Sequence, residues 1–193
     1  MSFAEKSEKK ESKTMDSKTK TLDLVYTAMG VTLICVCSWI NIPMTVPFTL
    51  QTFAIPAVLL ILGKKRGTIA TIVYVLMGAI GIPVFAGFTG GLAILLGNTG
   101  GYIIGFIFIA LIYTAAVKIF GEKKGVKIIS LIAGLIVCYA FGTAWFMYIY
   151  LKDTGDVGLI TVLTWCVLPY IVPDLVKIFL AILISDRVKR FIR

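Results

Sequence analysis

Two residues of opposite charge lie three positions apart in an apolar run near the C-terminal end of the sequence. Asp174 and Lys177 occur in LPYIVPDLVKIF, residues 168–179, whereas most other apolar runs of the chain carry no charge. An unpaired ion buried in hydrocarbon costs at least about 2.5–3.5 kcal/mol. The i, i+3 spacing puts both side chains on one face of a helix, where they can pair. The two residues therefore form either a structural ion pair or part of a binding site.

Two prolines beside the pair favour a binding site. Pro169 and Pro173 cannot donate a backbone hydrogen bond, so the carbonyls near residues 165 and 169 lose their helical donors. Irregular backbone is tolerated at membrane depth where protein covers it or where it lines a polar cavity. An acid, a base and two prolines within nine residues indicate a site for a ligand that has both hydrogen-bond donors and acceptors.

Uncharged polar residues gather in two other segments, PMTVPFTLQT (residues 43–52) and LGNTGGY (residues 96–102). Prolines in the first and glycines in the second make both segments irregular. We expect them to cap a cavity that is reached from outside, although any one residue could also be an ordinary polar loop residue. The polar residues are Thr45, Thr49, Gln51, Thr52, Asn98 and Thr99.

Signatures of catalysis and metal binding are absent from the sequence. The chain has no His, so it has no HExxH motif, and it has no GxSxG motif. None of its Gly-rich stretches continues into the Lys and Ser or Thr of a nucleotide-binding loop. We therefore expect no catalytic residue and no metal site, and an ATP-driven step would need another polypeptide. The four cysteines lie in apolar segments, where we expect small buried side chains rather than disulfides.

Membrane helices are the elements that must position these residues. The sequence is 59% hydrophobic and 15% charged, with a mean hydropathy of +0.96, and it has no charged residue between positions 67 and 117. Soluble domains are about 45–50% apolar and about 25% charged. The composition predicts an all-α, polytopic membrane protein. The net charge of +9 lies in short clusters between apolar segments, which is typical of membrane topology rather than of nucleic-acid binding.

Six apolar spans are predicted to be membrane helices. The predicted spans are residues 22–41, 50–62, 67–83, 98–119, 127–150 and 159–185. The second and third are short and are separated only by residues 63–67, so we expect a tight helical hairpin. Gly97, Gly101 and Gly105 recur every four residues, a stripe that permits close helix packing.

Charge asymmetry between the connecting segments predicts the orientation. The basic segments are the N-terminal segment and residues 64–66, 121–127 and 186–193. They alternate with segments that are uncharged or net negative, namely residues 41–49, 81–97 and 152–158. The positive-inside rule then places both termini in the cytoplasm. We expect residues 1–21, rich in Lys, Ser, Glu and Thr, to be a disordered cytoplasmic tail, and residues 22–193 to form the transmembrane domain.

Three separated motifs carry a resemblance to a known family. VPFTLQT, GLAILLGNTGGY and PDLVK occur in this order, and residues 22–190 resemble the BioY family, the biotin-specific substrate-binding (S) components of energy-coupling factor (ECF) transporters. The resemblance implies a six-helix S-component fold that captures biotin from outside, without a cofactor or enzymatic activity of its own. It also implies partners in the cytoplasmic membrane: a transmembrane coupling subunit (the T component) and two cytoplasmic ATPases.

The resemblance also assigns site residues. By motif match, Asp174 and Lys177 are the acid and base that bind biotin, and Asn98 is the amide that joins them, at a position where many relatives have Pro. The substrate-binding residues we expect are Asp174, Lys177, Asn98, Gln51, Thr49 and Tyr102. The segment VPFTLQT would gate the pocket. Ala28 and Thr32 match the family's Ala-x-x-x-Ala docking stripe, with Thr in place of the second Ala.

The functional groups of biotin suit an acid and a base. Its ureido ring offers two N–H donors and a carbonyl acceptor, and it has an apolar ring and chain that end in a carboxylate. Asp174 could accept from the ureido N–H groups, and Lys177 could donate to the ureido oxygen or to the carboxylate. Two alternatives remain at this point: an S component for another small vitamin, and a proton-coupled permease or intramembrane enzyme that uses Asp174 and Lys177.

Overall fold

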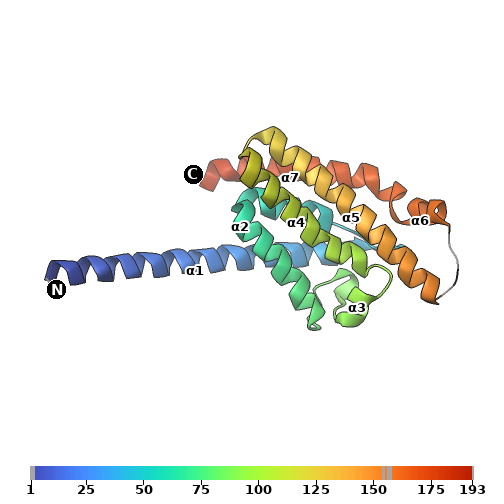
Figure 1. The fold of residues 1–193 in the computed structure, drawn as a ribbon, viewed down its shortest axis with the longest axis horizontal. Helices are drawn as coiled ribbons and strands as arrows, with labels where there is room; N and C mark the ends of the chain where they lie inside the picture. The colour runs from blue at the N-terminus through green and yellow to red at the C-terminus, as the bar shows by residue number, and fades with distance from the viewer. Residues whose placement is uncertain (1–2, 154, 156–157, 193) are drawn as a thin grey trace.

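Helices make up almost the whole chain in the computed structural model, which describes residues 3–153, 155 and 158–192 (Figure 1). The long helices are α1 (Phe3–Trp39), α2 (Gln51–Ala79), α4 (Gly100–Phe120), α5 (Lys124–Asp153) and α7 (Leu168–Ile192). The short elements are β1 (Asn41–Ile42), β2 (Phe48–Thr49), η1 (Ala86–Phe88), α3 (Leu92–Leu96) and α6 (Leu159–Cys166). The all-α class is confirmed. Apart from the short α3 and η1, the described residues form six helices when α2 is counted as two and α6 is joined to α7.

Helix α1 extends well beyond the span predicted at residues 22–41. Residues 3–21, for which we expected disorder, continue the helix, and Figure 1 shows this N-terminal part projecting beyond the bundle. The sequence has no Pro or Gly before Gly30, and Lys and Glu are good helix formers, so nothing in the segment ends the helix. The buried side chains of α1 that join the core all lie in its C-terminal part; they are Val31, Ile34, Cys35 and Cys37.

Helix α2 is the helical hairpin that its two short apolar runs predicted. Gly63 interrupts it with φ 82° and ψ 169°, a conformation that favours glycine. A Cβ placed on Gly67 would lie only 2.7 Å from the Cα of Leu59. Because these residues lie four positions on either side of Gly63, the two halves fold back against each other. The turn is shorter than predicted, since residues 64–66 already belong to the second half.

Glycines bring α4 and α5 into close contact. A Cβ on Gly101 would lie 2.3 Å from the Cβ of Trp145, and one on Gly105 would lie 2.6 Å from the Sγ of Cys138. The predicted packing role is thus confirmed for these two positions. Gly97 differs because it lies before α4, at the end of α3. The close approach of α5 to α4 brings residues of both helices to one wall of a cavity described below.

The last span is built from two helices. Helix α6 ends at Cys166, Val167 has φ −126° and ψ −56°, and α7 begins at the next residue. Pro169 occupies the first turn of α7, where a backbone N–H has no partner within the helix, so its absence costs no helical hydrogen bond. Pro173 lies inside the helix. The irregular backbone that the prolines predicted therefore occurs at Val167, seven residues before Asp174.

Short elements cover one end of the bundle. Strands β1 and β2 form an antiparallel hairpin in which Asn41 pairs with Thr49 and Ile42 with Phe48. The indole N–H of Trp39 donates to the carbonyl of Pro83 at 3.0 Å, which joins the start of this hairpin to the segment that contains η1 and α3. The two connections predicted as outer loops, residues 41–49 and 81–97, thus contain ordered structure.

Among the residues that the structure describes, four helical segments have the length and apolarity of a membrane span. They are Lys18–Trp39, Gly100–Phe120, Lys124–Lys152 and Leu159–Arg190. Large apolar side chains remain exposed along these helices, among them Ile129, which is 70% exposed, and Val172, which is 68% exposed. An outward apolar surface on several long helices is what a bilayer requires. The chain is a multi-pass membrane protein.

Candidate functional site

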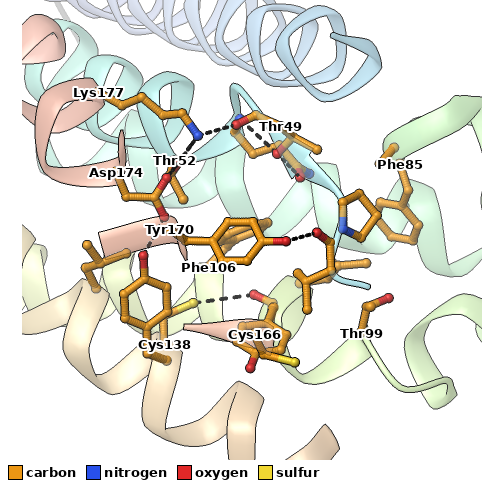
Figure 2. A pocket seen from close by; sticks show the side chains of 18 of the residues that line it. Thr49, Thr52, Phe85, Thr99, Phe106, Cys138, Cys166, Tyr170, Asp174 and Lys177 are labelled. Atoms are coloured by element: carbon orange, nitrogen blue, oxygen red, sulfur yellow. Dashed lines mark hydrogen bonds and ion pairs between the residues drawn. The ribbon is translucent and has the colours of Figure 1, made fainter. Parts of the chain in front are cut away.

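Asp174 and Lys177 form a buried ion pair in α7. The Nζ of Lys177 lies 2.9 Å from Oδ1 of Asp174, and the two residues are only 7% and 3% exposed, respectively. Figure 2 shows both side chains directed toward the segment that contains Thr49 and Thr52. The helical spacing predicted this pairing. The close-up shows the pair among the side chains that line a cavity.

The ammonium of Lys177 is held by the strand and helix that follow the first loop. It donates to the carbonyl oxygen of Thr49 at 2.6 Å and to the hydroxyl of Thr52 at 3.2 Å. It also lies 3.7 Å from the centre of the Phe48 ring, within the range of a cation–π contact. Lys177 therefore joins α7 to β2 and to the start of α2.

Asp174 has donors on both of its oxygens. Oδ1 accepts from the hydroxyl of Thr52 at 2.7 Å and from Lys177, and Oδ2 accepts from the phenol of Tyr139 at 2.6 Å. A carboxylate offers about four lone-pair sites, and these three bonds leave about one of them for a ligand. The carboxylate is thus fixed in position and keeps the capacity to accept another hydrogen bond.

Thr49 and Gln51 belong to a chain of neutral hydrogen bonds beside the ion pair. The Thr49 hydroxyl donates to Oε1 of Gln51 at 2.8 Å, and Nε2 of Gln51 donates to the phenol oxygen of Tyr74 at 2.5 Å. Tyr74 in turn donates to Ser38 or to the carbonyl of Val84, each at 3.1 Å. The chain connects α1, both halves of α2 and the segment before η1, so it fixes Thr49 at the edge of the cavity.

A cavity of about 270 Å³ opens beside the ion pair. This volume lies near the lower end of the range for small-molecule pockets, roughly 300–1,000 Å³. The polar lining comes from Thr49, Gln51, Thr52, Thr89, Thr99, Asp174 and Lys177. The aromatic lining comes from Phe85, Tyr102, Phe106, Tyr139 and Tyr170, with Ile94, Ile103 and Leu135 between them. One charged pair in a mostly apolar enclosure suits a small ligand with a polar head group.

Tyr170 holds the loop between β1 and β2 over this cavity. Its hydroxyl donates to the carbonyl oxygen of Val46, and its ring lies 6.1 Å from the ring of Phe48. Val46 and Pro47 line the cavity from the loop side. The loop is therefore attached to α7 at two places, through Tyr170 and through Lys177.

The predicted site residues divide between the cavity and its surroundings. Asp174, Lys177, Thr49, Gln51 and Tyr102 all line the cavity, and the phenol of Tyr102 is 3.1 Å from the hydroxyl of Thr143. Asn98 is not among the lining residues; its neighbour Thr99 occupies that place. Thr99 is the N-cap residue of α4, and Figure 2 shows it among the side chains that line the cavity.

Thr52, Tyr139 and Tyr170 line the cavity but were not on the predicted list of substrate-binding residues. The sequence showed Thr52 as one of several polar residues after the first loop. It gave no signal for Tyr139 or Tyr170, because a tyrosine in an apolar helix is equally common as a packing residue.

The cysteines behave as the sequence predicted. All four are buried and free of disulfides in the structure. Cys138 and Cys166 contribute two of the apolar surfaces of the cavity wall. They act as small hydrophobic side chains.

Ala28 and Thr32 do not line the cavity. Both are exposed on α1 and line a shallow apolar groove of about 680 Å³ between α1 and the first half of α2. The Thr32 hydroxyl donates to the carbonyl of Ala28 at 3.0 Å, which satisfies the hydroxyl within the helix and leaves its methyl for the groove. The groove surface is therefore apolar in spite of the threonine.

Comparison with known proteins places these features in a family. A model of the BioY family matches residues 9–193. The biotin transporter BioY of Thermotoga maritima is 39% identical over 174 residues, which cover 86% of this chain and 95% of that protein. The probable biotin transporter BioY of Pyrococcus horikoshii is 39% identical over 174 residues, covering 89% and 98%.

A solved structure agrees with the sequence relatives. The crystal structure of the S-component for biotin from an ECF-type ABC transporter has a TM-score of 0.77 to this chain at 27% identity, and the match covers 90% of this chain and 93% of that one. The family model covers nearly the whole sequence, and both relatives exceed 30% identity over most of their own length. The chain belongs to the BioY family.

Proposed function

We propose that the chain captures biotin from outside and takes it up across the cytoplasmic membrane as the S component of an ECF-type transporter. The observation that carries the proposal is the buried Asp174–Lys177 pair, 2.9 Å apart at the wall of an enclosed, mostly apolar cavity. Relatives that cover most of the chain are named as biotin transporters. The matching crystal structure is named as the S-component for biotin of an ECF-type transporter.

The polar head group of biotin suits the geometry of the pair. Asp174 accepts a ureido N–H through the lone-pair capacity that its three protein donors leave open. The ammonium of Lys177 donates to the ureido oxygen or to the carboxylate of biotin. Both contacts lie in a site from which water is largely removed, where charge-assisted hydrogen bonds are strong.

The apolar lining suits the remainder of the ligand. The thiophane ring and the aliphatic chain require a surface such as that of Phe85, Phe106 and Ile103, which line the cavity together. Burial of apolar area contributes roughly 25 cal/mol per Å². Biotin therefore gains affinity from both parts of the pocket.

The orientation follows from the placement of basic residues. The turn of α2 at Gly63, the loop before α5 and the C-terminal end of α7 are basic, and the positive-inside rule assigns them to the cytoplasm. Both termini would then be cytoplasmic, and the cavity beneath β1 and β2 would open to the outside. The loop between these strands would act as the gate.

Transport would depend on partner proteins. The chain contains no nucleotide-binding loop in its sequence, so a T component and two cytoplasmic ATPases would supply the coupling to ATP, and the chain itself would not be an enzyme. The exposed apolar groove that contains Ala28 and Thr32 is the proposed docking surface for the T component.

Binding of radiolabelled biotin to the purified protein tests the site. Asp174→Asn and Lys177→Ala should each lower the affinity by about 30-fold or more, because loss of one partner of a buried charge pair costs roughly 2–5 kcal/mol of binding free energy. Asp186→Asn and Lys118→Ala, which change charge away from the cavity, are matched controls. Unchanged binding in both site variants would refute the assignment.

Two further measurements separate the alternatives. Competition by thiamine or riboflavin at concentrations near those of biotin would indicate another vitamin as the substrate. Uptake by this chain alone, driven by a proton gradient and unaffected by ATPase partners, would indicate a permease.

A further inference from the structure

A second cavity, of about 630 Å³, lies at the end of the bundle opposite the biotin cavity. It is formed by Leu60 and Ile61 next to the turn of α2, the loop before α5, the first turns of α5 and the last turns of α7. Ser185, which lines the second cavity, lies eight positions after Lys177 on α7. At about 1.5 Å per residue this is roughly 12 Å, so the two cavities are distinct.

This inner cavity has an excess of positive charge. Its basic residues are Lys124, Lys127, Lys189 and Arg190, and its acidic residues are Glu122 and Asp186. Lys124 pairs with Asp186 at 3.0 Å and Lys127 with Glu122 at 3.1 Å. Four positive and two negative side chains leave the lining with a net charge of +2.

Glu122 shows the effect of this charge on a carboxylate. The pKa of Glu122 is lowered, first by the hydrogen bond from Lys127 and by its charge, and further by the charges of Lys189 and Lys64. These cations stabilise a negative group at the cavity, so a second anionic group that enters meets the same attraction.

One wall of the inner cavity is apolar and continues onto the outer surface of the bundle. Leu60, Ile61, Ile128 and Ile182 line this wall, and Ile129, the neighbour of Ile128, is 70% exposed. A small soluble anion would contact only the basic residues and would leave the apolar wall uncovered. A lipid would cover both, because its head group can contact the basic residues and its acyl chains can pack against the apolar wall.

We propose that the inner cavity binds an acidic phospholipid, with the phosphate of its head group beside Lys189 and Arg190 and its acyl chains against the wall that includes Leu60 and Ile182. Basic pockets between membrane helices commonly hold anionic head groups. The site depends on the membrane location of the chain and not on the identity of its vitamin, since no residue lines both cavities.

Native mass spectrometry of the full chain in neutral detergent tests the site, with dioleoylphosphatidylglycerol and dioleoylphosphatidylcholine as the probes. The wild type should bind the phosphatidylglycerol about tenfold or more tightly than the phosphatidylcholine. The double variant Lys189→Gln/Arg190→Gln should lose most of this preference, since one basic side chain near an anionic lipid contributes about fivefold.

The matched control is Lys65→Gln/Lys118→Gln, which removes the same charge from two exposed residues that do not line the cavity. It should bind phosphatidylglycerol as the wild type does, and all three proteins should bind biotin equally. An equal loss in the control, equal binding of the two lipids, or displacement of the phosphatidylglycerol by millimolar inorganic phosphate would overturn the proposal. Failure of all three proteins to bind biotin would count against the proposed function and not against this site.

Discussion

The two ends of the helical bundle hold their ion pairs in different environments. At the cavity beside α7, the side chains of Lys177 and Asp174 are 8% and 4% exposed, and each makes further hydrogen bonds to neighbouring elements. At the inner cavity, the side chains of Lys124 and Asp186 are 83% and 42% exposed. The two N–O distances are nearly equal, 2.9 and 3.0 Å, so distance alone does not distinguish the pairs.

The difference in burial assigns the two pairs different roles. A buried pair has lost its hydration, so each charge depends on its protein partners and its geometry is fixed. An exposed pair is screened by water and contributes little to stability, typically 0–1 kcal/mol. The buried Asp174–Lys177 pair is suited to recognising one ligand in one orientation, and the charged residues of the inner cavity are suited to attracting anions without a rigid geometry.

Removal of one charge from the buried Asp174–Lys177 pair should have the largest effect on stability. Asp174→Leu or Lys177→Met leaves the other charge buried without its partner, which costs roughly 3–5 kcal/mol. The double variant should lose much less than the sum of the two, because no unpaired charge remains. Unfolding of the three variants in detergent measures the coupling, and strictly additive losses would contradict the importance of burial.

Tyr139→Phe should weaken biotin binding by roughly tenfold. It removes the donor at 2.6 Å from Oδ2 of Asp174, and a hydrogen bond to a charged group contributes about 1.5–3 kcal/mol. Equilibrium binding of labelled biotin is the measurement. Tyr148→Phe is the control, since Tyr148 lies on the same helix and is 54% exposed. Equal affinities for the two variants would mean that Tyr139 does not position the carboxylate.

Tyr170→Phe should speed the release of biotin by about fivefold. The change removes the hydrogen bond to the carbonyl of Val46 and keeps the ring beside Phe48. A typical net contribution of about 1 kcal/mol corresponds to this factor. A chase with unlabelled biotin measures the dissociation rate, again with Tyr148→Phe as the control. If release were as slow as in the wild type, Tyr170 would not hold the loop closed.

Lys124→Gln should have the smallest effect on stability, below about 1 kcal/mol. It removes an ion pair whose lysine side chain is 83% exposed. The unfolding midpoint in neutral detergent, free of anionic lipid, should stay near that of the wild type. A loss as large as that of Asp174→Leu would abolish the distinction between the two ends.

The sequence was most informative where one physical constraint acts alone. The apolar content and the charge-free stretch between residues 67 and 117 required membrane helices whatever their packing. The i, i+3 spacing of Asp174 and Lys177 required them to share a helix face. The two short spans around Gly63 required a tight turn. Each of these expectations matches the structure.

The sequence was less informative where the outcome depends on packing between distant segments. Tyr139 lies on another helix, 35 positions before Asp174 in the sequence, and donates a hydrogen bond to it. Its neighbours in the sequence are apolar, as are those of Tyr148, which is exposed. Asn98 is a second example of an outcome that depends on packing. Its motif predicted a substrate-binding residue, but the turn between α3 and α4 brings the next residue, Thr99, to the cavity. The segment before residue 22 was predicted to be disordered from its polarity, whereas its backbone continues α1.

Thr49 joins the Asp174–Lys177 ion pair to the chain of neutral hydrogen bonds that runs through Gln51 to Tyr74. Its carbonyl accepts from Lys177, and its hydroxyl donates to Gln51. Withdrawal of β2 from the cavity would therefore take a hydrogen bond from a buried ammonium and uncouple the Tyr74 chain in the same movement. We therefore expect the closed loop to be the resting state even without ligand. Capture of a ligand would then wait for a rare opening of the loop, and its rate would fall below the diffusion limit.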